Sequence, residues 1–98
     1  MSDLDDRRDE PAESRDAAGN TPLLLASAAG QTGIVKRLLS GDADIEARNM
    51  VEMTPLMRAA RHGHSNVVAI LLKKGADRSA VDERDQTAQQ HAILAGYP

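Results

Sequence analysis

The feature that most constrains this chain is an internal repeat of 33 residues. Residues 16–48 align with residues 49–81 without a gap and share eleven identical positions. The identical stretches include Thr21-Pro22-Leu23 with Thr54-Pro55-Leu56, Gly30 with Gly63, and Leu38-Leu39 with Leu71-Leu72. A truncated third copy covers residues 82–98. A period of this length indicates stacked supersecondary units, and such stacks usually bind proteins rather than catalyse reactions.

Composition limits what the stack can be built from. Tyr97 is the only aromatic residue, so the core must consist of Leu, Ile, Val, Met and Ala. The absence of cysteine excludes thiol chemistry and thiolate metal sites. No run of apolar residues reaches the ~20 needed to span a membrane, and the acidic N-terminus does not resemble a signal peptide. The sequence therefore predicts a cytoplasmic or nuclear protein without a membrane partner.

The net charge of −3 lies entirely in the first 15 residues. This segment has one large apolar residue, Leu4, and cannot bury enough surface to offset its ordering entropy. We expect a disordered acidic tail over residues 1–15, followed by the repeat domain over residues 16–98. The tail is either a solubilising leader or an acidic interaction arm. Its charged residues are Asp3, Asp5, Asp6, Asp9, Glu10 and Glu13 against Arg7, Arg8 and Arg15.

Local signals predict a first helix in each full repeat. Thr21 and Thr54 are favourable N-cap residues, and the prolines that follow them suit the first helical position, where no amide donor is needed. Gly30 and Gly63 tolerate the positive φ that ends a helix. The predicted first helices cover residues 22–29 and 55–62.

A second helix follows in each repeat, over residues 32–40 and 65–74. Its apolar residues recur at i, i+1, i+4 and i+5, which is one stripe on a 3.6-residue period. We expect Ser65 to cap the second of these helices and Gly75 to end it. The stripes are Ile34, Val35, Leu38 and Leu39 in repeat one, and Val67, Val68, Leu71 and Leu72 in repeat two.

Repeat two resembles the ankyrin repeat. The residues that carry the resemblance are Met53-Thr54-Pro55-Leu56, Ala59 to His64, and Leu71–Asp77. The resemblance covers residues 16–98. It implies an all-α, short ankyrin-repeat solenoid of antiparallel helix pairs. The two full repeats (16–48 and 49–81) and the truncated third (82–98) would carry projecting β-turn fingers at about residues 45–53 and 78–86.

Several positions depart from that family pattern. The histidine that usually follows Thr-Pro-Leu is absent, so its side-chain hydrogen bond is lost. The glycine of the finger is replaced in two repeats, where we expect strained or differently shaped turns. An arginine also replaces an apolar residue in the second repeat's first helix. The substituted positions are Leu24, Met57 and Gln90, then Glu52 and Asp85, and Arg58.

The number of repeats raises a question of stability, because solenoids generally need about three. Repeat one also begins with Leu23-Leu24-Leu25, which we expect to form an exposed apolar edge. Three interpretations stay open: the chain belongs to a longer array, it self-associates through this edge, or its partner orders it.

Catalytic and metal sites are not expected. The His62-Gly63-His64 pair lacks further ligands, and no nucleophile lies beside a base on a strained turn. No glycine-rich phosphate loop is present, so no cofactor is predicted. The neutral body and acidic tail are also unlike the basic footprint of a nucleic-acid-binding protein.

One cluster of basic residues has two interpretations. Arg58 and Arg61 share the end of a first helix, and Arg48 lies in the finger before it. Arg58 either lays its stem on the core and extends its charge to water, or joins Arg48 and Arg61 in gripping a carboxylate of an acidic peptide.

The resemblance implies that partners contact the finger tips and the inner face of the first helices. Met50, Val51 and Met53, in the finger at residues 48–53, are expected to be exposed, and methionine adapts to irregular partner surfaces. We therefore predict a non-enzymatic module for a protein or peptide partner, with a groove only about 25 Å wide. The alternatives are a structural fragment and a stoichiometric inhibitor of an enzyme. The predicted binding residues are Arg48, Met50, Val51, Met53, Arg58, Arg61, His62, Glu83, Arg84 and Gln86.

Overall fold

The computed structural model describes residues 14–97, so the predicted disordered tail lies outside the described range except for Ser14 and Arg15. Five α-helices and no β-strand lie in the described part, which confirms the all-α prediction. None of these helices is long and apolar enough to cross a membrane. They are α2 (Pro22–Ala29), α3 (Thr32–Ser40), α4 (Pro55–Arg61), α5 (Ser65–Lys73) and α6 (Ala88–Leu94).

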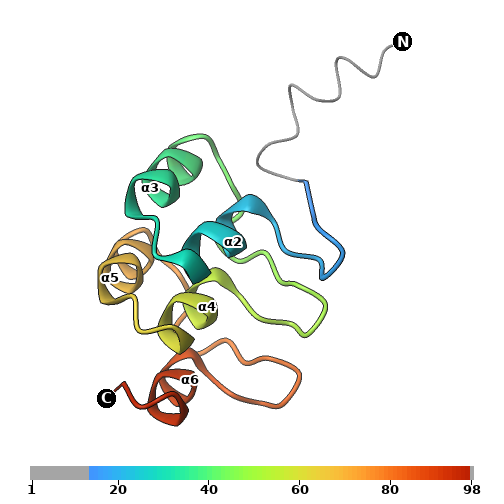
Figure 1. Cartoon of the computed structure of the whole chain (residues 1–98), viewed down its shortest axis with the longest axis vertical. Coiled ribbons are helices and arrows are strands. Elements are labelled where there is room, and N and C mark those ends of the chain that lie inside the picture. Colours follow the sequence, from blue (N-terminus) through green and yellow to red (C-terminus); the bar gives the residue numbers. More distant parts are fainter. Residues whose placement is uncertain (1–13, 98) are drawn as a thin grey trace.

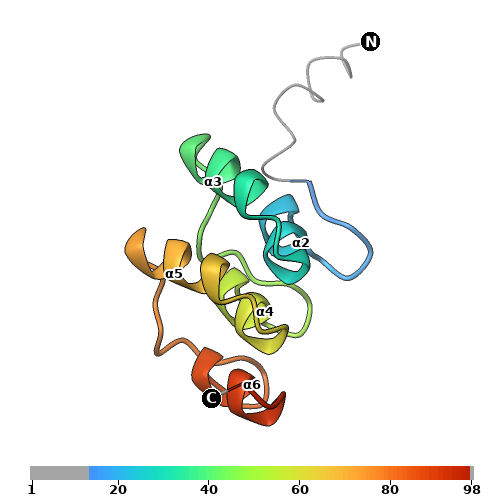
Figure 2. The same cartoon turned by 60° about the vertical axis from the view of Figure 1, so that its left-hand side comes forward.

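The helices form two layers (Figures 1 and 2). The inner helices α2, α4 and α6 lie side by side, while the outer helices α3 and α5 pack on α2 and α4 and on each other. The segments before α2, α4 and α6 project away from the helices, on the right-hand side of Figure 1. We call them the first finger (residues 15–20), the second finger (48–53) and the third finger (81–86).

The inner helices begin where the Thr-Pro pairs predict. The hydroxyls of Thr21 and Thr54 each accept a hydrogen bond of 3.3 Å from the backbone amide three residues later. Thr87 starts α6 in the same way and adds a capping box, because the side-chain oxygen of Gln90 accepts from the Thr87 amide at 2.8 Å. Gln90 stands where the family usually has histidine, and it stabilises the helix start instead.

The helix ends agree with the prediction to within one residue. α4 ends at Arg61 and α5 at Lys73, each one residue earlier than expected. The prediction that Ser65 caps α5 is wrong, because Ser65 is already the first helical residue and the N-cap is His64, without a side-chain cap bond. The glycines after α2, α4 and α5 have the expected positive φ: 73° at Gly30, 71° at Gly63 and 96° at Gly75.

The core lies where the two layers meet. Position 57, where the family pattern has histidine, holds a methionine with no exposed surface. An apolar side chain there needs no hydrogen-bond partner, so the loss of histidine leaves no polar group unsatisfied. The other fully or almost fully buried apolar residues include Leu23, Leu24, Ala26, Val35, Leu56, Ala59, Val67 and Leu71.

The prediction of an exposed edge at Leu23–Leu25 is wrong for two of its three residues. Leu23 and Leu24 are 1% and 0% exposed, and only Leu25 is accessible, at 43%. Consecutive residues of a helix point about 100° apart, so three leucines in a row cannot share one outer face. Self-association through this edge therefore loses its structural basis.

Aromatic rings join successive repeats at two equivalent glycines. His64 lies over Gly30, where an added Cβ would come within 2.6 Å of the ring, and its Nε2 lies 2.9 Å from the Ala28 carbonyl oxygen. Tyr97 lies over Gly63 in the same way, at 2.5 Å. Both glycines thus end a helix and leave room for a ring from the next repeat.

The predicted strain at the substituted finger glycines is confirmed. Gly19 in the first finger has a φ of 81°, and its counterparts Glu52 and Asp85 adopt 65° and 62°. Asp42 adopts 68° where repeat two has Gly75. Residues with a Cβ pay a steric penalty in this left-handed region, so these turns are held by contacts elsewhere.

Candidate functional site

Each finger is built around one side chain that accepts two backbone hydrogen bonds. The Oδ1 atoms of Asp16, Asn49 and Asp82 bind the amides two and four residues later, at 2.8–3.0 Å. These residues are spaced by 33, and the motif was missed at the sequence level although Asp and Asn are the residues that favour such local turns. The three fingers therefore share one backbone shape.

Arginine side chains tie each finger to the next. The Nη1 atom of Arg15 donates to the carbonyls of Gly19 and Arg48, both at 2.7 Å. Arg48 repeats this contact with the carbonyls of Glu52 at 2.9 Å and Val81 at 2.6 Å. Arg15 therefore belongs structurally to the repeat body, although the predicted boundary placed it in the tail.

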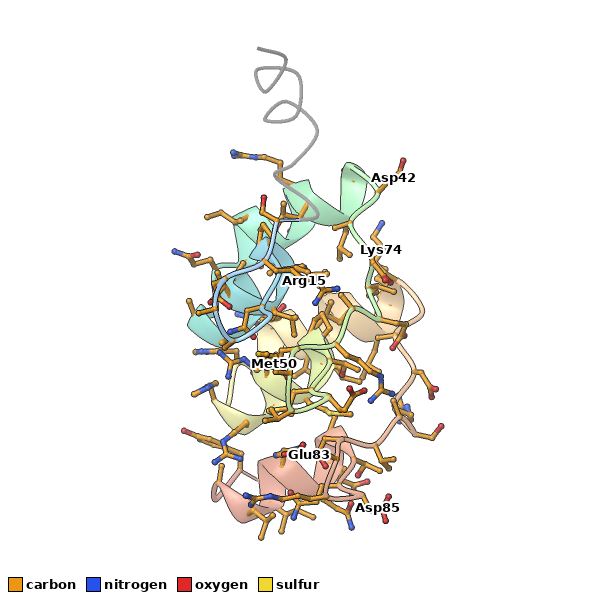
Figure 3. The ribbon with its side chains drawn as sticks, turned by 90° about the vertical axis from the view of Figure 1, so that its right-hand side faces the viewer. Arg15, Asp42, Met50, Lys74, Glu83 and Asp85 are labelled. Atoms are coloured by element: carbon orange, nitrogen blue, oxygen red, sulfur yellow. The ribbon has the colours of Figure 1, made fainter. Side chains whose placement is uncertain are left out.

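Backbone bonds complete the row of fingers. The Met50 amide donates to the Ala18 carbonyl at 3.0 Å, and the Glu83 amide donates to the Val51 carbonyl at 3.4 Å. Figure 3 shows Arg15, Met50 and Glu83 one below another along this row. Because side chains and backbone both link the fingers, the row is held in one preorganised arrangement.

A cavity of about 290 Å³ lies between the second and third fingers and the inner helices α4 and α6. It brings together seven of the ten predicted binding residues, and adds two that sequence reasoning did not assign to the site, Asp82 and His91. We call it the finger groove. The seven predicted residues that line it are Val51, Met53, Arg58, Arg61, Glu83, Arg84 and Gln86.

The floor of the finger groove is a buried polar cluster. The Nε2 atom of His91 lies 2.8 Å from Oδ2 of Asp82, and its Nδ1 lies 3.4 Å from Nη1 of Arg61. The guanidinium is only a donor, so it pairs with Nδ1 as acceptor, while Nε2 faces the Asp82 carboxylate as donor. His91 and Asp82 are 2% and 8% exposed.

This cluster keeps the Asp82 carboxylate charged. Burial opposes the charge, but hydrogen bonds from the amides of Gln86 and Arg84 and from His91 outweigh it and lower the pKa of Asp82. Because these bonds occupy its oxygens, Asp82 is a structural anion rather than a free ligand. The positive charges of the surrounding arginines are therefore only partly compensated.

Arg58 has a donor without a partner. Its Nε is enclosed and makes no hydrogen bond in the described part of the chain, while the residue as a whole is half-buried. Arg58 can therefore lay the aliphatic part of its side chain on the core, as one interpretation predicts, and still line a binding site. An unpaired buried N–H costs free energy, but this atom has almost no accessible surface, so a ligand would meet Arg58 through its terminal guanidinium nitrogens.

Three predicted binding residues lie outside the finger groove. Arg48 is engaged between fingers, and Met50 projects at the second finger tip with 71% of its surface exposed. His62 is exposed on the far end of α4. Partial burial, followed by the charges of Arg58, His64 and Arg61, lowers the pKa of His62.

The expectation that Met53 is exposed is wrong. Met53 is 6% exposed and belongs to the core, because its amide and carbonyl are both bonded to Asn49 and the side chain turns inward. Its finger neighbour Val51 is 43% exposed and lines the groove. The second finger therefore leaves Met50 and Val51 exposed.

In residues 14–97, no three His, Asp or Glu side chains lie close enough together to hold a metal ion. His62 and His64 stack with ring centroids 6.2 Å apart, but Nε2 of His64 is directed to the Ala28 carbonyl.

Comparison with known proteins places the whole repeat region in one family. A family model described as ankyrin repeats, in three copies, matches residues 4–82 and 33–98. No individual curated protein matches the chain.

Proposed function

The chain belongs to the ankyrin-repeat family, whose members are generally protein–protein interaction modules, and from this premise we propose that it binds an acidic peptide segment in the finger groove. The observation that carries the proposal is the convergence of three arginines, Arg58, Arg61 and Arg84, on one groove. The proposal includes no catalytic step.

Charge supports an acidic ligand. Three arginines line the groove against two carboxylates, and one of these, Asp82, is already held by backbone amides and His91. Glu83 lies at the third finger tip, where solvent screens it. A guanidinium presents paired donors that match a carboxylate, so a glutamate or aspartate side chain fits the place between Arg58 and Arg61.

Apolar residues at the second finger supply the rest of the surface. Met50 and Val51 are exposed next to the groove, and methionine adapts to irregular partner surfaces. The ligand we propose is therefore a short segment with an acidic residue flanked by apolar ones. A module of this size acts as an adaptor or as a regulatory binder, and inhibition of a partner enzyme would be one consequence of such binding.

Titration with a designed probe tests the proposal. The probe is a labelled peptide with two adjacent glutamates between leucines, and its control has glutamines in their place. We expect the glutamate peptide to bind more tightly, with an affinity that falls as salt rises. Arg61→Glu should weaken binding at least about tenfold, because attraction becomes repulsion.

Arg37→Glu is the matched control, because Arg37 is exposed on the outer helix α3, away from the groove. It should leave the affinity unchanged. Equal binding of the two peptides, or equal loss in the Arg37 and Arg61 variants, would refute an acidic-peptide site in the finger groove.

A further inference from the structure

The acidic tail is the part of the chain to which the proposed function assigns no role. Its residues 1–13 carry six carboxylates and two arginines, a net charge of −4. Within this stretch, Leu4-Asp5-Asp6 sets two adjacent carboxylates beside a leucine. An acidic pair next to an apolar residue is the pattern that we propose for the ligand of the finger groove.

The tail joins the body at one end of the row of fingers (Figure 3). Ser14 is the first described residue, and Arg15 directly after it donates to the Arg48 carbonyl of the second finger at 2.7 Å. Arg48 in turn donates to the carbonyl of Val81 at 2.6 Å, and the next residue, Asp82, lines the finger groove. The tail therefore enters the body two arginine contacts away from the groove.

The tail is long enough to reach the finger groove. Packed helices lie about 8–10 Å apart, so a groove between the second and third fingers lies roughly 15 Å from the first finger. An extended chain covers about 3.5 Å per residue, so the stretch from Asp6 to Ser14 spans up to roughly 28 Å. The stretch from Glu10 to Ser14 spans only about 14 Å. Asp5 and Asp6 can thus lie inside the groove, whereas Glu10 reaches at most its near edge.

Charge draws the tail toward this groove. Arg58, Arg61 and Arg84 line it, and the last two are exposed. The positive charge also acts on the first finger: a backbone hydrogen bond from Asn20 is the main cause that lowers the pKa of Asp16, and the charge of Arg58 lowers it further. Because the acidic tail belongs to the same chain, its carboxylates meet the arginines at a higher effective concentration than a free peptide does.

The opposite charges match as well. Arg7 and Arg8 follow the acidic pair directly. Exposed carboxylates, Glu52 and Glu83, lie on the two fingers that border the groove. A tail that places its acidic pair among the groove arginines therefore brings its own arginines toward these finger carboxylates.

We propose that Asp5 and Asp6 of the tail occupy the finger groove until a partner segment displaces them. Their carboxylates pair there with the terminal nitrogens of Arg58 and Arg61. The inference rests on the proposed function, because it needs a groove that recognises acidic segments. It makes the tail an intramolecular competitor: a partner meets only the fraction of chains whose groove is free, and its apparent affinity falls in proportion to that fraction.

The test compares the full chain with a tail variant that carries Asp5→Asn and Asp6→Asn. The tail variant should bind the labelled glutamate peptide about three- to tenfold more tightly, as expected if the tail fills the groove roughly two thirds to nine tenths of the time. Without peptide, the amides of Val51, Arg58 and Arg84 should shift in NMR spectra between the two chains. In an Arg61→Glu background, the same tail substitutions should no longer shift them.

The matched control carries Asp9→Asn and Glu10→Gln. It removes the same charge from a part of the tail that does not reach into the groove, and it should change the affinity for the glutamate peptide by less than about twofold. Circular dichroism checks that both variants keep the helices of the wild type.

The outcomes separate this inference from the proposed function. A preference for the glutamate over the glutamine peptide that is equally strong in the wild type, the tail variant and the control would overturn the inference alone. An equal gain in the tail variant and the control would do the same. Equal binding of the two peptides to the tail variant would refute the proposed function itself. Groove shifts that depend on protein concentration would show a tail bound to a second copy, which overturns the intramolecular contact.

Discussion

Replacing Asn49 should test how much stability one finger side chain supplies. Asn49 is 7% exposed, and its Oδ1 accepts from the amides of Val51 and Met53, both at 3.0 Å. Its Nδ2 donates to Oδ1 of Asn20 at 3.0 Å, which links the second finger to the first. Asn49→Ala removes all three bonds. It leaves the backbone amides of Val51 and Met53 and the side-chain oxygen of Asn20 without these partners.

The magnitude follows from these bonds. Each intramolecular hydrogen bond contributes roughly 0.5–1.5 kcal/mol, so three of them give a loss of about 2–4 kcal/mol in the free energy of unfolding. For a domain of this size, such a loss lowers the melting temperature by about 10–25 °C. Asn49→Asp should cost less, about 1 kcal/mol, because a carboxylate still accepts from both amides and loses only the bond to Asn20.

Urea unfolding followed by circular dichroism measures the three free energies. Because stacks of few repeats are marginal, a stabilising osmolyte keeps the weakest variant folded at the start of the titration. Asn66→Ala is the control, since Asn66 is exposed on α5. If Asn49→Ala and Asn66→Ala unfold at the same urea concentration, the fingers are not held by this side chain and the reasoning fails.

For three further positions the structure predicts whether a substitution raises or lowers stability. Glu52→Gly should raise the free energy of unfolding by about 0.5–1 kcal/mol, because glycine adopts the left-handed φ of this turn without steric strain. A lower melting temperature in thermal unfolding would contradict this. Gly63→Ala should destabilise the chain through its φ and its clash with the Tyr97 ring, and Tyr97→Gly should remove the second part of that cost. The lowered pKa of Asp82 gives stability that is present above the ordinary value of 3.8 and lost as the pH falls through the folded pKa. Asp82→Asn should therefore reduce the slope of acid unfolding, and an unchanged slope would exclude this contribution.

The helices could be predicted because their signals are local. A threonine and a proline determine where α2 and α4 begin, and a glycine determines where α2 ends, within a few residues of sequence. The N-cap of α5 was wrongly placed at Ser65, because both His64 and Ser65 are polar residues at the start of the helix. Only the backbone geometry shows that His64 is the N-cap.

The candidate site was predicted only in part, because burial in the fingers depends on contacts between repeats. Met50 and Met53 look alike in the sequence, yet one projects from the second finger and the other turns into the core. The bond between Asp82 and His91 was missed, since it joins a finger to α6 across nine residues. The 33-residue spacing of Asp16, Asn49 and Asp82 carried a signal that could have identified the finger motif.

The most direct test of the central claim is an NMR titration of the labelled chain with the glutamate peptide. We expect shifts of the amides of Val51, Arg58 and Arg84 around the finger groove, and the loss of these shifts in Arg61→Glu. Shifts confined to other surfaces, or the same shifts with the glutamine peptide, would contradict the claim that the finger groove binds an acidic segment.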